Sequence, residues 1–398
     1  MSNRKKILFV SARLPYPALE GHQIRAFGIL RQLSKKYDVH LLSLLREGEE
    51  IDYNNELGKL CSSISGVKVS SGIFSSLIAG LSALKVNYPL VVTKYVTANL
   101  KGQFEDKIKT VKPDIVHLDL LPLAGLLPLI PDGINVVLNE HNLESDLIKQ
   151  KLSTLNSFVS KSIYKREYIK LLSFEKKSIR LVDAVLACSP KDAEDLTSLG
   201  GGSVYCIPNG VDAERLKPNN NNKKFKTIVF LGGMGWYPNR LGIIWFLNDV
   251  LPLINKIDPE IKLQIIGNPE PAVEIPEDVK SNVEVLGFVD DFIPYVQSSA
   301  LMIVPLNVGS GTRLKVVEGL ALGKCMVSTS KGAEGVGLTH GVDILFADTA
   351  SDFSEQVIKA ISSTESTSLI ELNARKLADN VYDWNVIGKD LYDIYESL

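Results

Sequence analysis

Residues 6–45, KILFVSARLPYPALEGHQIRAFGILRQLSKKYDVHLLSLL, carry the pattern from which the fold class is predicted. An apolar run, KILFVS, is followed by a helical pattern at residues 21–36 and then by a second apolar run, VHLLSL. Strands that alternate with helices in this way are typical of βαβ units, whose strands are parallel. The same alternation continues in DIVHLDL, INVVLNE, AVLACS and VYCIP. We therefore predict an α/β fold with a mostly parallel, doubly wound sheet.

A second domain is predicted after residue 226. Residues 208–226 are polar and rich in Pro and Asn, which is typical of a linker. The alternation then resumes in TIVFLG, LQIIG, VEVLGF, LMIVPL and CMVSTS. We expect Rossmann-like domains at residues 1–207 and 227–382, because 398 residues are enough for two cores. Apolar residues at helical spacing in residues 383–398 predict a C-terminal helix that packs back on the first domain.

The composition excludes several classes of protein. A formal net charge of -2 argues against a protein whose main task is to bind nucleic acid. The four cysteines lie far apart without metal-binding spacing, which favours a reduced, cytoplasmic chain without structural zinc. The first apolar run is too short for a signal peptide, and we find no uninterrupted run of about 18 to 20 apolar residues that would span a membrane.

Charge is distributed unevenly along the chain. Residues 1–206 hold 27 Lys/Arg and 21 Asp/Glu, a net of +6, which leaves -8 for the remainder. Residues 147–180 combine apolar side chains at helical spacing with nine Lys/Arg and two Glu. They are either a basic amphipathic surface for an anionic membrane or acceptor, or a long solvated helix. The second interpretation is favoured, because such faces are common on ordinary helices.

Candidate site residues follow strands in the first domain. Doubly wound sheets bind ligands at the carboxyl ends of their strands, so we expect a site in the cleft between the two domains. Gly21 precedes His22 and Arg25 at a helix start, which can hold an anion or be an ordinary turn with a surface arginine. His141 in VVLNEHNLES can bind a sugar hydroxyl or transfer a proton, but it can also be a capping histidine.

The second domain offers two glycine-rich segments after strands. FLGGMGWYPNR contains Gly233 but matches neither the dinucleotide fingerprint nor the ATPase P-loop, and such clusters are often only tight turns. VGSGTRLKVVEGLALGK, residues 308–324, places Arg313 and Lys315 in the first turn of a predicted helix. Cations there are disfavoured by about 0.3 to 1 kcal/mol each.

A bound diphosphate would reverse that preference. The backbone N–H groups of Gly311, Thr312 and Arg313, the forked Arg313 guanidinium and the Lys315 ammonium all suit a diphosphate. Glu318 lies three residues after Lys315, so it can pair with Lys315 or accept hydrogen bonds from ribose hydroxyls. The alternative is an ordinary surface helix that starts with a Lys315–Glu318 ion pair.

Together with LGFVDD and the linker motif IPNGVD, these segments resemble the GT-B glycosyltransferases of the retaining family 4 type, glycosyl transferases group 1, in the bacterial surface polysaccharide subgroup. The resemblance covers most of the second domain, and in the first it rests on EGHQIR, NEHN and CSPKD. It implies two facing Rossmann-like domains with an interdomain cleft, the first for an acceptor and the second for a nucleotide-activated sugar. No metal or other cofactor is implied, because basic residues and helix dipoles stabilise the leaving diphosphate.

The resemblance also implies roles for individual residues. Glu318 corresponds to the glutamate that binds the ribose, and the backbone of Phe288 and Val289 corresponds to the loop that contacts the base. Gly21 corresponds to a phosphate-side glycine, and His141 to the histidine beside the transferred sugar. Gly233 lies in the donor loop.

This chain departs from the family pattern at two places. Ser310 stands where the family has a glutamate that touches the donor sugar. The Arg and Lys pair that follows the first strand of the donor domain is missing, since that loop offers only Arg240. The phosphate role therefore shifts to Arg313 and Lys315.

We therefore expect a metal-independent, retaining glycosyltransferase of the hexosyl or related class, in the cytoplasm and peripherally on the inner face of the cell membrane. Its expected partners are a nucleotide-diphosphate sugar and a glycan or lipid-linked acceptor of surface polysaccharide or lipopolysaccharide assembly, with no nucleic acid. His22 and Arg25 would lie on the acceptor side. Two alternatives stay open: a nucleotide-sugar epimerase on the same fold, and a catalytically silent nucleotide-sugar-binding protein, which Ser310 keeps in consideration.

Overall fold

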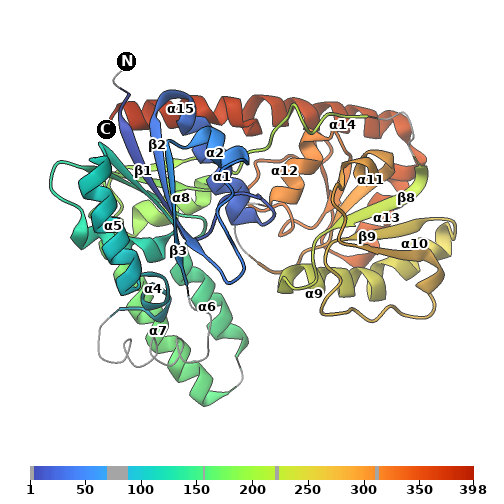
Figure 1. Cartoon of the computed structure of the whole chain (residues 1–398). Coiled ribbons are helices and arrows are strands. Elements are labelled where there is room, and N and C mark those ends of the chain that lie inside the picture. The colour runs from blue at the N-terminus through green and yellow to red at the C-terminus, as the bar shows by residue number, and fades with distance from the viewer. Residues whose placement is uncertain (1–3, 70–87, 156, 220–223, 310–312) are drawn as a thin grey trace. The chain divides into compact units, whose positions relative to one another are not determined.

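The computed structural model describes residues 4–69, 88–155, 157–219, 224–309 and 313–398. The chain divides into two compact units, here called the first and second domains (Figure 1). The first contains Met1–Pro208 and Gly388–Leu398, and the second contains Asn209–Ile387. Residues 209–219, which we interpreted as linker, thus belong to the second domain. Their backbone joins it through Arg375, which donates hydrogen bonds to the carbonyls of Leu216 and Ala213.

The first domain is built on a parallel sheet. Its described residues form seven strands in the order β3-β2-β1-β4-β5-β6-β7. The strands are β1 (Lys6–Ser11), β2 (Asp38–Leu45), β3 (Ser63–Lys68), β4 (Ile115–Asp119), β5 (Asn135–Asn139), β6 (Ala184–Ala187) and β7 (Val204–Cys206). The chain runs outward from β1 to β3 and then returns to the other side of β1. This reversal between β1 and β4 is the point where doubly wound sheets bind ligands, and it confirms the predicted fold class.

The strand register brings polar side chains to one level at the carboxyl edge of this sheet. Ser11 pairs with Asp119, and Asp119 pairs with Asn139. The central strands β1, β4 and β6 are buried along almost their whole length, because helices cover both faces of the sheet. Polar side chains at their ends are therefore held by a rigid apolar core.

The helices of the first domain connect these strands. They are α1 (Gly21–Lys36), α2 (Glu56–Leu60), α4 (Leu90–Tyr95), α5 (Ala98–Val111), the 3₁₀ helix η1 (Leu121–Leu129), α6 (Glu144–Thr154), α7 (Phe158–Ser178) and α8 (Pro190–Ser198). A capping box begins α1: the side chains of Glu20 and Gln23 bond each other's backbone N–H groups. Ser189 caps α8 by accepting a hydrogen bond from the Asp192 N–H, 3.1 Å away.

Residues 147–180 do not form the single helix that we considered. They are divided between α6 and α7, which pack side by side in the first domain (Figure 1). Ser157 begins α7 as its N-cap and accepts a hydrogen bond from the backbone of Ser160. The break is thus produced by a capping residue, whose side chain competes with continued helix.

The second domain repeats the doubly wound pattern. Its described residues form a six-stranded parallel sheet in the order β10-β9-β8-β11-β12-β13, with the reversal between β8 and β11. The strands are β8 (Lys224–Leu231), β9 (Lys262–Ile266), β10 (Val283–Gly287), β11 (Ser299–Val304), β12 (Met326–Ser328) and β13 (Leu345–Phe346). The helical elements are α9 (Tyr237–Trp245), the π-helix η2 (Phe246–Val250), α10 (Leu251–Ile257), η3 (Lys280–Asn282), α11 (Ile293–Ser298), α12 (Leu314–Ala321), α13 (Ala350–Ser362), α14 (Thr364–Leu377) and η4 (Ala378–Tyr382).

The last helix, α15 (Trp384–Glu396), begins in the second domain and ends in the first. Its Tyr395 is fully buried, and the Tyr395 hydroxyl lies 2.5 Å from Nδ1 of His117 on β4. The His117 ring stacks on Phe9 of β1, with ring centroids 4.1 Å apart. The end of α15 is therefore part of the core of the first domain. Every helix in the described parts of the chain is too short or too polar to cross a membrane.

Candidate functional site

Lys315 reaches from α12 to the carboxyl end of β8, at the reversal point of the second sheet. Its ammonium donates hydrogen bonds to the Leu231 carbonyl and to Oδ1 of Asn239, the latter at 2.7 Å. It also lies 4.5 Å from the ring centroid of Phe230. Burial lowers the pKa of Lys315 to about 7; the charge of Arg313 acts in the same direction and that of Glu318 opposes it.

A glycine makes room for this contact. Gly232 follows β8 with φ of 154°, in the region that favours glycine. A Cβ atom at this position would lie 2.4 Å from Nδ2 of Asn239 and 2.7 Å from Nζ of Lys315. A Cβ atom at Gly267, after β9, would lie 2.5 Å from the backbone of Gly232. The loops after β8 and β9 therefore need these two glycines in order to pack against each other and admit Lys315.

Arg313 is buried next to the same loop. The residue is 4% exposed, and its guanidinium lies 5.2 Å from the ring centroid of Trp236, just before α9. Burial lowers the pKa of Arg313 to about 10, while Glu334 opposes that shift. Arg313 and Lys315, which we predicted in the first turn of one helix, thus both face residues 230–239.

Glu318 lies one turn after Lys315 on α12. Burial raises its pKa to about 7, and the charges of Lys315 and Arg215 oppose this shift. The residue as a whole is partly exposed. The ammonium of Lys315 binds Leu231 and Asn239 rather than forming the ion pair with Glu318 that we considered as an alternative.

Three further predicted residues of the second domain, Gly233, Phe288 and Val289, lie in loops at the same edge of the sheet. Phe288 and Val289 directly follow β10, and Phe288 is 65% exposed. The Gly233 carbonyl accepts a hydrogen bond of 3.0 Å from Nδ2 of Asn239. Ser310, Gly311 and Thr312 lie outside the described residues. We call Lys315, Arg313, Glu318 and Asn239, with the loop of residues 232–236, the second-domain cluster.

In the first domain, His141 lies within a hydrogen-bond network at the carboxyl edge of the sheet. Its Nε2 is 2.8 Å from Oδ1 of Asp119, which ends β4. Nδ2 of Asn139, the last residue of β5, donates to the same Asp119 oxygen at 2.7 Å. Burial opposes ionisation of Asp119, yet its contacts with His141 and Asn139 hold its pKa below the usual value. We call Asp119, Asn139 and His141 the first-domain cluster.

Arg25 is positioned differently from our prediction. It is fully buried rather than open to an acceptor. Its guanidinium donates to Oδ1 of Asn139 at 2.8 and 3.0 Å and to the Ile207 carbonyl at 2.6 Å. Arg25 therefore ties α1 to β5 and to the end of β7, because a buried guanidinium must have its donors satisfied.

Gly21 and His22 begin α1 and remain accessible. Gly21 is exposed, and His22 is partly buried. The Arg13 guanidinium lies 3.4 Å from Nε2 of His22 and 2.6 Å from the Glu20 carboxylate. Burial lowers the pKa of His22, and the Arg13 charge adds to this effect.

Three residues of these clusters were missed from the sequence. Asp119 and Asn139 end neighbouring strands of the sheet, and Asn239 lies in the first turn of α9, after a glycine loop. Polar side chains at consecutive strand ends in DIVHLDL and INVVLNE were the available signal for the first two. Asn239 offered a weaker signal, because an asparagine near a helix start is usually read as a cap.

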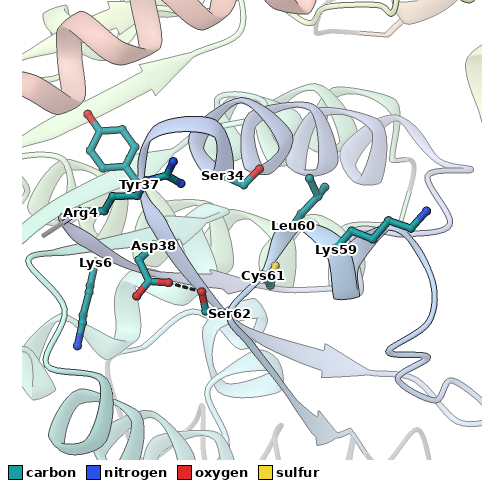
Figure 2. Close-up of a pocket in the computed structure, with 9 residues that line it drawn as sticks. All are labelled: Arg4, Lys6, Ser34, Tyr37, Asp38, Lys59, Leu60, Cys61 and Ser62. Atoms are coloured by element: carbon teal, nitrogen blue, oxygen red, sulfur yellow. Dashed lines mark hydrogen bonds between the residues drawn. The ribbon is translucent and has the colours of Figure 1, made fainter. Parts of the chain in front are cut away.

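A separate cavity of about 400 Å³ lies in the first domain and is lined by polar residues that include Lys6, Asp38 and Ser62 (Figure 2). Lys6 and Asp38 begin β1 and β2, so this cavity is at the amino edge of the sheet. The Ser62 hydroxyl donates to the Asp38 carboxylate, as Figure 2 shows. Ligands of doubly wound sheets bind at the opposite edge, where both clusters lie. We therefore assign this cavity no role in the candidate site.

Two protein-family models match the chain. The model described as Glycosyltransferase Family 4 matches residues 20–215, which include the first-domain cluster. The model described as Glycosyl transferases group 1 matches residues 225–363, which include the second-domain cluster. Together the two matches cover most of the chain.

Individual proteins also resemble this chain. A Klebsiella pneumoniae protein, described as an uncharacterized 44.6 kDa protein in the cps region, is 25% identical over 404 residues, which cover 97% of this chain and 99% of that protein. The structure of Anabaena Alr3699/HepE in complex with UDP has a TM-score of 0.70 at 14% identity and covers 99% of this chain and 100% of that chain. Sucrose-phosphate synthase from Thermosynechococcus elongatus has a TM-score of 0.73 at 15% identity, with 99% of each chain covered. These structures share the GT-B fold predicted from the sequence.

Proposed function

Because this chain belongs to the glycosyltransferases of family 4 and group 1, we propose that it transfers a sugar from a nucleotide-diphosphate sugar to an acceptor hydroxyl with retention of anomeric configuration. The observation that carries this proposal is the position of Lys315. Its ammonium is held at the end of β8 beside Arg313, with Glu318 one turn further along α12. Two cations and a carboxylate at this spacing suit a diphosphate and a ribose.

In the proposed reaction the acceptor oxygen forms a bond to the anomeric carbon while the bond from that carbon to the diphosphate oxygen breaks. The bonding electrons go to the diphosphate, which also takes the proton of the acceptor hydroxyl. Attack from the face of the leaving group retains the configuration. Arg313 and Lys315 stabilise the charge that develops on the diphosphate, so we propose that no metal ion is needed.

His141 is proposed to orient the transferred sugar and to stabilise charge in the transition state. Its Nε2 lies 2.8 Å from Oδ1 of Asp119, and we propose that it donates to this carboxylate, which selects one tautomer of the ring. Nδ1 then remains as the ring atom that accepts a hydrogen bond. This arrangement suits recognition of a sugar hydroxyl.

The biological setting that we propose is assembly of a surface polysaccharide in the cytoplasm. The Klebsiella relative described as lying in a cps region supports it. We further propose that the first half of α7 contacts an anionic membrane that holds a lipid-linked acceptor. Phe158, Val159 and Ile163 there are 86%, 66% and 58% exposed, and Lys161, Lys165 and Arg166 lie between and beside them.

The test is a thermal-shift screen against UDP-, GDP-, ADP- and dTDP-sugars, followed by transfer assays with the donor that binds. A ligand that binds the folded state raises the midpoint of thermal unfolding as its concentration exceeds its dissociation constant.

Glu318→Ala should lower the affinity for the nucleotide sugar about 10- to 100-fold, because a bidentate carboxylate contact to ribose is lost. Chelation of divalent metals should leave transfer unchanged.

Several outcomes would count against the proposal. A protein that neither binds nor turns over any of these donors is not a glycosyltransferase of this kind. Unchanged affinity in Glu318→Ala would remove the ribose assignment. A new sugar isomer formed from donor alone would instead identify an epimerase. As a matched control, Glu355→Ala removes a carboxylate from α13 in the same domain and should bind nucleotide like the wild type.

A further inference from the structure

Lys315 and Asn239 come from different helices and meet at the end of β8. We propose that Asn239 is a positioning residue for the transfer reaction: its side-chain oxygen directs the Lys315 ammonium toward the leaving diphosphate. This inference rests on the proposed function, since it needs a diphosphate at this edge of the sheet. It adds a role for a residue that contacts the lysine and not the substrate.

The contacts of Asn239 fix the orientation of its amide. Nδ2 donates to the Gly233 carbonyl at 3.0 Å, so Oδ1 is left to face Nζ of Lys315 at 2.7 Å. The Asn239 backbone N–H donates to the Trp236 carbonyl at 3.0 Å, and the residue is only 5% exposed. The amide is therefore rigid, with its acceptor aimed at the ammonium.

The ammonium gains a defined direction from this arrangement. A lysine has a flexible four-carbon stem and three N–H donors. Two of these donors are occupied by the Leu231 carbonyl and by Asn239. No other described residue accepts a hydrogen bond from this ammonium, so we propose that the third donor serves a phosphate oxygen. Holding the stem in one geometry before the donor binds lowers the cost of ordering it during the reaction.

Asn239 is an uncharged partner, and this affects the charge of the Lys315 ammonium. The charged groups that act on Lys315 are Arg313, the N-cap of α12, and Glu318 on α12 itself. The hydrogen-bond acceptors that β8 and α9 offer to Lys315 are uncharged: the Leu231 carbonyl and the Asn239 amide. Asparagine therefore orients the ammonium without neutralising it, whereas an aspartate at the same place would form an ion pair. The pKa of Lys315, lowered by burial to about 7, makes its charge sensitive to the chemistry of this neighbour.

The test measures UDP binding by calorimetry from pH 5.5 to 9 in the wild type, Asn239→Asp and Asn239→Ala. Wild-type binding should weaken as the pH rises through about 7, because Lys315 then loses its proton. In Asn239→Asp the added carboxylate raises the pKa of Lys315, so this weakening should move by about one pH unit or more to the alkaline side. At pH 6 the same variant should bind UDP about tenfold more weakly, because its ammonium is already paired.

A double-mutant cycle separates positioning from a general effect on folding. Asn239→Ala should lower UDP affinity about 10- to 100-fold in the wild-type background and change nothing further in Lys315→Met. A purely structural role, such as loss of the bond to Gly233, would weaken both backgrounds equally. Asn248→Asp adds the same charge at an exposed position further along this helical segment and should leave the pH profile unmoved.

These outcomes also distinguish the two proposals. If the wild type binds no nucleoside diphosphate, the proposed function fails and the inference fails with it. The second case is that the wild type binds UDP, but Asn239→Ala lowers UDP affinity equally in the wild-type and Lys315→Met backgrounds. Only the proposed role of Asn239 is then overturned. An unshifted pH profile in a folded Asn239→Asp would overturn it as well, since titration of UDP itself is the same for every variant.

Discussion

Two buried asparagines near the carboxyl ends of strands, Asn139 in the first sheet and Asn239 after β8 in the second, hold ionisable groups of the candidate site. Asn139 receives hydrogen bonds from Arg25 and donates to Asp119, while Asn239 receives one from Lys315 and donates to the Gly233 carbonyl. An amide can donate and accept at once, and it carries no charge. It therefore connects groups in a buried site without adding the cost of burying another ion.

The hydrogen bond between Asp119 and His141 gives a prediction at the scale of single residues. Asp119→Asn keeps the size of the side chain but removes the carboxylate that selects the His141 tautomer. We expect kcat to fall about 10²- to 10⁴-fold, with little change in donor KM, because orientation of the histidine matters in the transition state. Steady-state kinetics measures both parameters.

Asp114→Asn is the matched control for this prediction. Asp114 precedes β4 at the opposite edge of the sheet, where its carboxylate accepts a hydrogen bond from the Lys6 N–H at 2.7 Å. This variant should retain kcat. If Asp119→Asn keeps full activity while folding normally, the contact with His141 is structural only.

At the scale of elements, a group of glutamates lies where β5, α6 and α7 meet. Glu175 of α7 accepts hydrogen bonds from the backbone N–H groups of Glu144 and Ser145, at 2.9 and 3.4 Å, and so caps α6 from a neighbouring helix. Glu140, directly after β5, is 1% exposed, and no described residue donates to its carboxyl group. Burial and the charges of Glu175 and Glu144 raise the pKa of Glu140 well above its usual value.

This group predicts a pH dependence of stability. Burial, together with the charge of Glu175, raises the pKa of Glu144 from 4.5 to about 7. Between these values the folded state keeps a proton that the unfolded chain releases, so the free energy of unfolding falls as the pH rises. Glu144→Gln removes this contribution. The free energy of unfolding of Glu144→Gln, measured relative to that of the wild type, should therefore increase by about 1 to 3 kcal/mol between pH 5 and 7.5.

Denaturant unfolding at several pH values measures this difference. Glu194→Gln, at an exposed position on α8, is the control. Its free energy of unfolding should have the same pH dependence as that of the wild type. A constant difference between Glu144→Gln and the wild type at all pH values would show that Glu144 titrates normally in the folded protein.

At the scale of the whole molecule, charge separates along the chain. Residues 1–206 carry a net of +6 and the remainder a net of -8. The α7 surface, which comprises Phe158, Val159, Lys161, Ile163, Lys165 and Arg166, adds exposed apolar side chains to this positive part. Such a combination favours contact with anionic lipid through both apolar insertion and charge.

We therefore expect vesicles with anionic lipid to sediment the protein at low salt and to release it as salt increases. Replacing Lys161 and Lys165 by Gln should weaken this binding about tenfold or more, since each basic residue near the surface contributes about 1 kcal/mol. Phe158→Ser should weaken it through lost apolar contact. Ile257→Ser, an exposed apolar residue of the second domain, is the control. Equal sedimentation with neutral vesicles would contradict the proposal.

Much of the fold was predictable because its signals are local. The strand at residues 6–11 and the helix at 21–36 were expected from the repeat of apolar residues, and both form. The break between α6 and α7 was not, because a single capping serine decides it against a continuous apolar pattern. The exposure expected for Arg25 was also wrong, since burial depends on which strand ends surround a side chain.

The sequence by itself thus determined the two parallel α/β domains and the presence of Arg313 and Lys315 at the start of one helix. Periodicity and helix position are properties of neighbouring residues. Only the tertiary structure decided which groups those residues meet. Lys315 and Asn239 are 76 residues apart, and Arg25 and Asn139 are 114 apart. The order of strands across each sheet determines which strand ends become neighbours, and therefore which of these residues meet. Local sequence patterns do not contain this information.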